Sequence, residues 1–157
     1  MAFANSTVKP SEESENICKA ESREQAIIVS QSASARMQKK ELGRKGEEIA
    51  IRFLKKKGYR ILEKNYVCKM GEMDVIAKEK DTLAFIEVKT RTSTAFGPPQ
   101  LAVNLTKQMQ LSKVALYFLK EKKLEDVKAR FDVVAIILGP KGEEIELIKD
   151  AFDLRYT

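Results

Sequence analysis

The chain has 157 residues, with 29 Lys and Arg against 23 Asp and Glu, a formal net charge of +6, two cysteines and no histidine. Without histidine it cannot build a Ser-His-Asp or Cys-His nucleophile, an HExxH zinc site or a histidine general base. Its two cysteines, Cys18 and Cys68, are too few for a disulfide scaffold or a four-cysteine zinc site.

Neither end of the sequence, nor any stretch between, carries a membrane signal. No run approaches the ~18 apolar residues of a membrane span, and the N-terminus lacks the charged-then-apolar pattern of a signal peptide. This length predicts one domain with a single core. We therefore expect a cytoplasmic protein with no membrane partner.

Charge is distributed unevenly along the chain. Residues 1–35 hold three basic and five acidic residues, a net of −2, so the total of +6 leaves +8 for residues 36–157. A compact basic body favours a polyanionic partner, and nucleic acid is the commonest one. Residues 1–35 contain only one short apolar cluster, Ala26 to Val29, which predicts a disordered or weakly ordered tail before a domain over 36–157.

The first strongly periodic segment predicts a helix from about Arg36 to Lys57, ended by Gly58. Apolar residues recur at helical spacing on one face: Leu42, Ile49, Ala50, Phe53 and Leu54. Gly46 permits another element to approach this helix closely.

Two adjacent acids on this predicted helix point in different directions. Glu47 falls on the flank of the apolar face and can reach inward, whereas Glu48 points to the opposite side. The alternative is that both are surface charges, with Glu47 paired to Arg44 and Glu48 to Arg52.

The segment Gly71 to Arg91 predicts two strands joined by a polar turn, with Asp74 in the first strand. Glu87 and Lys89 lie two residues apart in the second strand, so both point to one face of a run that otherwise requires burial. Buried carboxylates need compensation, and Asp and Glu oxygens are the ligands that Mg²⁺ prefers. The alternative is an edge hairpin with solvated charges.

After residues 92–97, which predict a connector, Pro98 and Pro99 predict the start of a second helix that runs to about Lys122. Gln100 and Lys107 in its N-terminal half are candidate phosphate contacts. Phe131 to Leu138 predicts an interior strand, and residues 143–148 predict a more exposed final strand. With an irregular strand over 59–68, the order is αβββαββ, which predicts an α/β fold with a mixed sheet flanked by helices.

Four motifs in this order resemble the PD-(D/E)xK nuclease superfamily. They are Gly43-x-x-Gly46-Glu47, Gly-Glu-Met-Asp at 71–74, Ile-Glu-Val-Lys at 86–89 followed by Arg91, and Arg-Phe-Asp-Val-Val at 130–134. Within this superfamily the arrangement is similar to archaeal Holliday junction resolvases and, more closely, to the small bacterial YraN-like family. The resemblance covers about residues 40–153 and implies a restriction-endonuclease-like αβββαβ core.

The resemblance also implies roles for individual residues. Asp74 and Glu87 match the two metal-binding acids, Lys89 the active-site lysine, and Glu47 the helix glutamate that completes the metal shell around Mg²⁺ or Mn²⁺. Glu72 belongs to the YraN-like pattern without an assigned role. Where the superfamily has Pro-Asp, this chain has Met73-Asp74.

Three functions from different classes follow. The first is a metal-dependent endonuclease that hydrolyses phosphodiester bonds in DNA, with branched DNA in repair or recombination as one substrate class and Arg91, Gln100 and Lys107 as candidate substrate contacts. The second is a non-catalytic nucleic-acid-binding module that acts by recruiting a partner. The third is a structural or interaction protein that uses the basic face for an acidic partner. A junction cutter would favour a two-fold homodimer.

Overall fold

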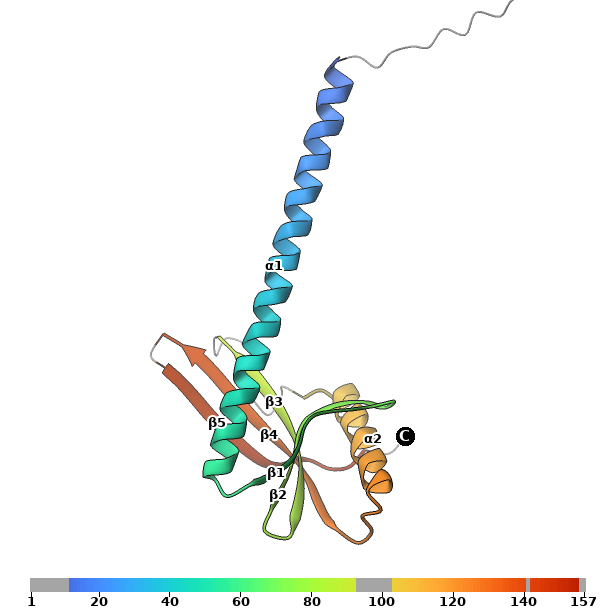
Figure 1. Ribbon diagram of the computed structural model, residues 1–157, viewed down its shortest axis with the longest axis vertical. Helices are drawn as coiled ribbons and strands as arrows, with labels where there is room; N and C mark the ends of the chain where they lie inside the picture. The colour runs from blue at the N-terminus through green and yellow to red at the C-terminus, as the bar shows by residue number, and fades with distance from the viewer. Residues whose placement is uncertain (1–11, 93–102, 141, 156–157) are drawn as a thin grey trace, which may run out of the picture. The chain divides into compact units, whose positions relative to one another are not determined.

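The computed structural model describes residues 12–92, 103–140 and 142–155, with side chains from residue 30 onward (Figure 1). The chain divides into two units, residues 1–40 and residues 41–157, and each is described by itself. Among the described residues of the first unit, 12–40 are helical. Neither helix in the described part has the length and apolar content needed to cross a bilayer.

Helix α1 spans Glu12–Lys56, so our prediction that it begins near Arg36 was wrong. The prediction relied on an apolar face, which residues 12–35 lack. The sequence between Pro10 and Gly43 contains neither glycine nor proline and is rich in strong helix formers, so propensity favours continuation of the helix. Residues 30–40 are exposed. The expected tail boundary at residue 35 therefore falls inside a helix, and residues 1–11 lie outside the described residues.

Helix α1 ends where predicted, through backbone hydrogen bonds around Gly58. The Gly58 N–H donates to the Lys55 carbonyl at 3.1 Å, and the Tyr59 N–H donates to the Leu54 carbonyl at 3.0 Å. This pattern requires the left-handed conformation of Gly58, whose φ is +88°. The side chains of Leu54 and Tyr59 are both buried in the same core cluster, which fixes the direction in which the chain enters the sheet.

The sheet has five strands: β1 Arg60–Cys68, β2 Gly71–Glu79, β3 Thr82–Arg91, β4 Lys128–Gly139 and β5 Gly142–Phe152. They lie side by side in sequence order, with β3 and β4 parallel and the other neighbours antiparallel. Helix α2, Leu105–Glu121, connects the two parallel strands. The predicted α/β fold with a mixed sheet flanked by helices is confirmed, and it is compatible with a restriction-endonuclease-like core.

Two apolar clusters cover the two faces of the sheet. On one face α2 contributes Leu111, Val114, Ala115 and Phe118 to a cluster that includes Phe85, Phe131 and Phe152. On the other face the C-terminal part of α1 contributes Ile49, Ala50 and Leu54, which pack on alternate residues of β2, β3 and β4. Burial on both faces explains why residues 83–86 of β3 and most of residues 131–138 of β4 are apolar.

Helix α2 begins at Leu105, seven residues later than the predicted start at Pro98. Asn104 is its N-cap, and the Asn104 side-chain oxygen accepts a hydrogen bond from the Lys107 N–H at 2.9 Å. The prediction placed the helix start at the two prolines, which lie outside the described residues. The start is set instead by Asn104, whose side chain satisfies the free backbone N–H of Lys107. The predicted end near Lys122 is confirmed.

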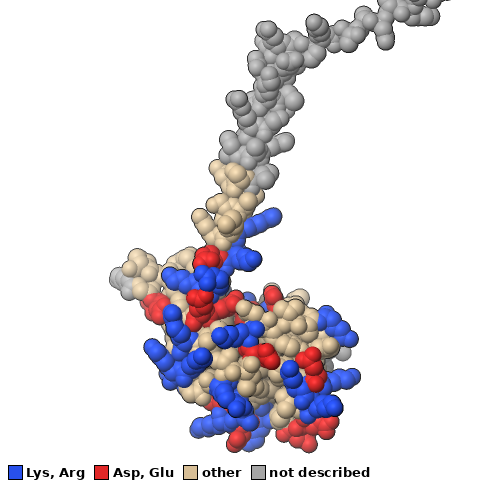
Figure 2. Space-filling view, viewed as in Figure 1, with Lys and Arg blue, Asp and Glu red and all other residues tan. Residues whose placement is uncertain are grey.

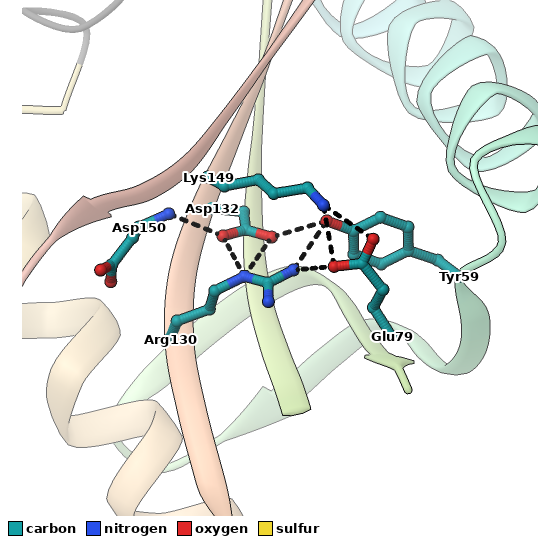
Figure 3. A network of polar contacts seen from close by, with 6 residues as sticks. All are labelled: Tyr59, Glu79, Arg130, Asp132, Lys149 and Asp150. Carbon is teal, nitrogen blue, oxygen red and sulfur yellow. Dashed lines mark hydrogen bonds and ion pairs between the residues drawn. The ribbon is translucent and has the colours of Figure 1, made fainter. Parts of the chain in front are cut away.

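Asp132 is a buried acid whose carboxylate is fully compensated (Figure 3). Its side chain accepts hydrogen bonds from Arg130 Nε at 2.9 Å and from the Tyr59 hydroxyl at 3.1 Å. The backbone N–H of Asp150 donates to the same carboxylate at 2.9 Å. Arg130 in turn donates to Glu79 at 2.7 Å, and Glu79 also accepts from Lys149. This network joins the end of α1 to β2, β4 and β5.

We predict that Arg130→Gln lowers the free energy of unfolding by about 3 kcal/mol, because it leaves the buried Asp132 charge without its cationic partner. Lys149→Gln removes an exposed cation from the same network and should cost only about 0.5 kcal/mol. Urea unfolding measures both variants. Equal losses would contradict the assignment of Asp132 as the residue on which the network depends.

Candidate functional site

The site forms where β2 separates from β3. The two strands are paired from Val75 opposite Ile86 to Glu79 opposite Thr82, and continuing this register would place Met73 opposite Val88. At that point the Val88 N–H donates instead to Asp74 Oδ2, at 2.7 Å. The Asp74 carboxylate thus takes the place of a ladder carbonyl and is held against β3.

Glu87 and Lys89 share one face of β3, as predicted from their spacing. Lys89 Nζ donates to Glu87 Oε1 at 2.6 Å, and Lys107 Nζ from α2 lies 3.4 Å from the same oxygen. Glu87 is buried, with 3% of its surface exposed, whereas the Lys89 and Lys107 side chains retain 31% and 25%. The carboxylate is therefore internal, and the two ammonium groups lie between it and solvent.

The second oxygen of Glu87 is the exceptional atom of the site. Glu87 Oε2 is buried and has no hydrogen-bond partner among the described residues. A buried, unsatisfied acceptor costs about 1–3 kcal/mol, and more when it carries charge. A cation bound at this oxygen would remove that cost, so the donor set fits a divalent metal ion such as Mg²⁺.

The carboxylates of the described residues nevertheless form no ready-made cluster of three metal ligands. Mg²⁺ is commonly held by one or two carboxylates and keeps its remaining positions for water and substrate phosphate. Asp74 and Glu87 are sufficient for that type of binding.

The environment raises the pKa of Asp74 to about 7. Burial is the largest cause, followed by the negative charge of Glu87. The Val88 N–H and the charge of Lys107 act in the opposite direction, and the charge of Glu47 raises the pKa further. Asp74 is thus within electrostatic range of both predicted partner acids, and in the absence of metal it exchanges its proton near neutral pH rather than near its ordinary pKa of 3.8.

Glu47 is positioned by the close contact between α1 and β3. It is half-buried, whereas Glu48 is exposed. Gly46 faces Thr90: a Cβ atom at residue 46 would overlap Thr90 Oγ1 and lie 2.8 Å from Thr90 Cβ. Only glycine therefore allows this part of α1 to approach β3, the strand that carries Glu87.

The alternative pairing that we considered for the helix acids differs from the structure. Arg44 pairs with Glu41 at 2.6 Å and with Glu48. Both pairs are exposed, and the Arg44 guanidinium holds the pKa of Glu41 below its usual range.

Three further residues named from the sequence are less closely tied to the site, and one of them is not described. Arg91 is the last residue of β3 and is half-buried, and Glu72 is an exposed residue of β2. Gln100 lies outside the described residues. Sequence reasoning missed Thr90 and the Asp74–Val88 hydrogen bond. Gly46 on a buried helix face was a signal for a close contact, but no pattern identified Thr90 as the partner.

Comparison with known proteins identifies a family. The model of "Uncharacterised protein family UPF0102" matches residues 46–136, which include Glu47, Asp74, Glu87 and Lys89. The chain is 54% identical to the UPF0102 protein of Syntrophus aciditrophicus over 114 residues, which is 73% of this chain and 90% of that protein. It is 57% identical to the UPF0102 protein of Geotalea daltonii over 118 residues, covering 74% and 93%. The YraN-like part of the resemblance is confirmed.

The raised pKa of Asp74 predicts how stability depends on pH without metal. Below the ordinary value of 3.8 both folded and unfolded chains hold the proton, and between that value and about 7 only the folded chain does. Stability therefore falls as pH rises through this window. Asp74→Asn keeps an acceptor for the Val88 N–H without the charge. In EDTA we expect it to stabilise the fold by on the order of 2 kcal/mol at pH 8, with the gain disappearing toward pH 4.

Thermal unfolding at both pH values measures this effect. The matched control is Asp81→Asn, an exposed aspartate in the β2–β3 turn, which should change stability little at either pH. A gain from Asp74→Asn that is independent of pH would contradict the proposed titration.

We predict that Gly46→Ala destabilises the protein by about 1–3 kcal/mol, because the added methyl group overlaps Thr90. Gly43→Ala is the control on the same helix: a Cβ there meets nothing within 4 Å, so improved helix propensity should stabilise by up to about 1 kcal/mol. Adding Thr90→Ala to Gly46→Ala should recover part of the loss. Denaturant unfolding of all three variants tests the contact, which is refuted if Gly46→Ala behaves like Gly43→Ala.

Proposed function

The chain belongs to the UPF0102 family, and we propose that it is a metal-dependent endonuclease of the PD-(D/E)xK type that hydrolyses phosphodiester bonds in DNA. The observation that carries the proposal is the buried, unpartnered oxygen of Glu87 beside the Asp74 carboxylate. Folding alone gives no reason to retain such an oxygen, because a neutral side chain at this position would avoid the cost of burying it.

Asp74 and Glu87 would hold the metal ion, Mg²⁺ or Mn²⁺, with Glu47 completing the shell. When bound, the ion supplies Lewis-acid chemistry: it makes water more acidic and neutralises negative charge on the scissile phosphate. The cation would also favour the ionised form of Asp74, whose pKa is raised to about 7 by burial and by Glu87.

Two lysines would act on the phosphate. Lys89 and Lys107 both contact Glu87 Oε1 while part of each side chain reaches solvent, so each can turn from the carboxylate to a phosphate that enters the site. Lys89, on the same strand as Glu87, would orient the attacking water or neutralise the charge that develops at phosphorus. Lys107, at the start of α2, would bind a non-bridging oxygen of the phosphate.

The charge of the surrounding surface is compatible with a polyanionic substrate. Figure 2 shows basic side chains over much of the visible face of residues 41–157, interspersed with acidic ones. The total charge of +6 has the same sign. A basic surface raises the rate at which DNA meets the protein, and it makes binding salt-dependent.

A nucleic-acid-binding module without catalysis is the second candidate. One observation favours it: no three metal-ligating side chains among the described residues lie together. The two candidates differ in what they require of Asp74. A purely binding protein gains nothing from two carboxylates beside a phosphate, because without metal they repel it.

We predict Mg²⁺- or Mn²⁺-dependent cleavage when the protein is incubated with branched, single-stranded and duplex DNA, and no cleavage in EDTA. Asp74→Asn and Lys89→Gln should each reduce the cleavage rate by at least about 100-fold. The matched controls are Asp81→Asn and Lys128→Gln, which change exposed residues with the same loss of charge. Metal-dependent cleavage that survives both site substitutions would contradict the proposal, and salt-sensitive binding without cleavage would favour the binding module.

A further inference from the structure

We infer that a groove along the outer face of α2 binds single-stranded DNA. The inference takes its class of ligand from the proposed function. The groove lies between α2 and the turn that joins β1 to β2, with a volume of about 870 Å³. The described residues that line it are Lys69, Met70, Lys113, Leu116, Tyr117, Lys120 and Glu121.

The groove carries positive charge. Its described lining has three lysines and one acid, Glu121. The Glu121 carboxylate accepts a hydrogen bond from the Tyr66 hydroxyl at 3.0 Å and lies 3.9 Å from Lys122 Nζ, so its charge is already partnered. Lys113 and Lys120 are exposed. An anionic ligand would therefore meet the lysines and little opposing charge.

The same groove exposes apolar surface. Met70 and Leu116 are 39% and 41% exposed, which is unusual for large apolar side chains that adjoin a core. Tyr117 adds an aromatic ring, with Lys69 Nζ 5.5 Å from its centroid. Cationic side chains that alternate with aromatic and apolar ones are typical of surfaces that hold the phosphates and the unstacked bases of a single strand.

The groove and the candidate site are both built on helix α2. Lys107 of α2 contacts Glu87. One turn further along the helix, the side chain of Gln110 lies so close to Gly71 that a Cβ atom on residue 71 would overlap it. Lys113 and Lys120 follow on the outer face. At 1.5 Å per residue, Lys107 and Lys120 are about 20 Å apart along the helix, which is about six stacked nucleotides.

The combination favours a single strand over a duplex. A duplex presents phosphates but keeps its bases stacked, so it would use the lysines and leave Met70, Leu116 and Tyr117 uncovered. An unpaired strand or tail can place bases on this apolar surface while its phosphates contact the lysines. The groove would thus select DNA with a single-stranded arm next to the position that is cut.

The test measures binding in EDTA, where no metal-dependent cleavage occurs. We would follow fluorescence anisotropy of labelled oligothymidylate of about 20 nucleotides across a salt series, with a blunt duplex of equal length in parallel. Lys113→Gln/Lys120→Gln should weaken binding of the single strand and reduce the log–log salt slope by about 1.4, which corresponds to two phosphate contacts. Tyr117→Ala should weaken binding of the single strand about tenfold without changing the slope, and leave duplex binding unchanged.

The matched control is Lys55→Gln/Lys128→Gln, which removes two exposed lysines that do not line the groove. It should leave the slope and the affinity near those of the unmodified protein. The inference is overturned if the unmodified protein does not bind the oligonucleotide, if both double variants lose affinity equally, or if Lys113→Gln/Lys120→Gln and Tyr117→Ala weaken duplex binding as much as single-strand binding.

Failure of this inference can be separated from failure of the proposed function. If the protein cleaves DNA in a metal-dependent way and its groove variants bind and cleave normally, only the inference that the groove binds single-stranded DNA is refuted. Loss of single-strand binding in the groove variants of a protein that never cleaves would support the groove and refute only catalysis.

Discussion

The hydrogen bond from the Val88 N–H to the Asp74 carboxylate is the interaction on which the candidate site depends. It forms where β2 stops pairing with β3, and it holds an acid in the place of a strand carbonyl. Asp74 is thereby brought within electrostatic range of Glu87, whose negative charge, after burial, raises the pKa of Asp74. Gly46 and Thr90 bring α1 to the same strand, which adds Glu47. The site is thus built by strand separation on one side and by helix approach on the other.

Two buried acids of the sheet, Asp132 and Glu87, differ in how fully their carboxylate oxygens are hydrogen-bonded. Asp132, 1% exposed, accepts from Arg130, Tyr59 and a backbone N–H, so its burial is compensated by the fold itself. Glu87, 3% exposed, has two lysines at one oxygen and, in the part of the chain that the structure describes, no hydrogen-bond partner at the other. Asp132 therefore serves the structure, and Glu87 has an oxygen available for an external cation. This contrast between Asp132 and Glu87 supports the metal-dependent proposal.

Sequence patterns predicted what depends on local periodicity. The hairpin over 71–91, the apolar run at 131–138 and the end of α1 at Gly58 each follow from short-range chemistry, and the motifs identified the family. Sequence patterns gave wrong predictions where helix propensity or tertiary contacts determine the structure, as at the start of α1. The partners of Asp132 include Tyr59, which is 73 positions away, and Lys149 meets Glu79 across 70 positions. No periodicity in one sequence encodes such pairs, and the same holds for Thr90 facing Gly46.

Calorimetric titration of the protein with Mn²⁺ near pH 7, in buffers of different ionisation enthalpy, tests most directly whether Asp74 and Glu87 form a metal site. Metal binding displaces protons from its ligands. The account predicts a saturable site whose apparent heat varies with the buffer, because Asp74 releases a proton, and whose affinity is lost in Glu87→Gln but kept in Asp81→Asn. Absence of binding, or equal binding by Glu87→Gln, would contradict it.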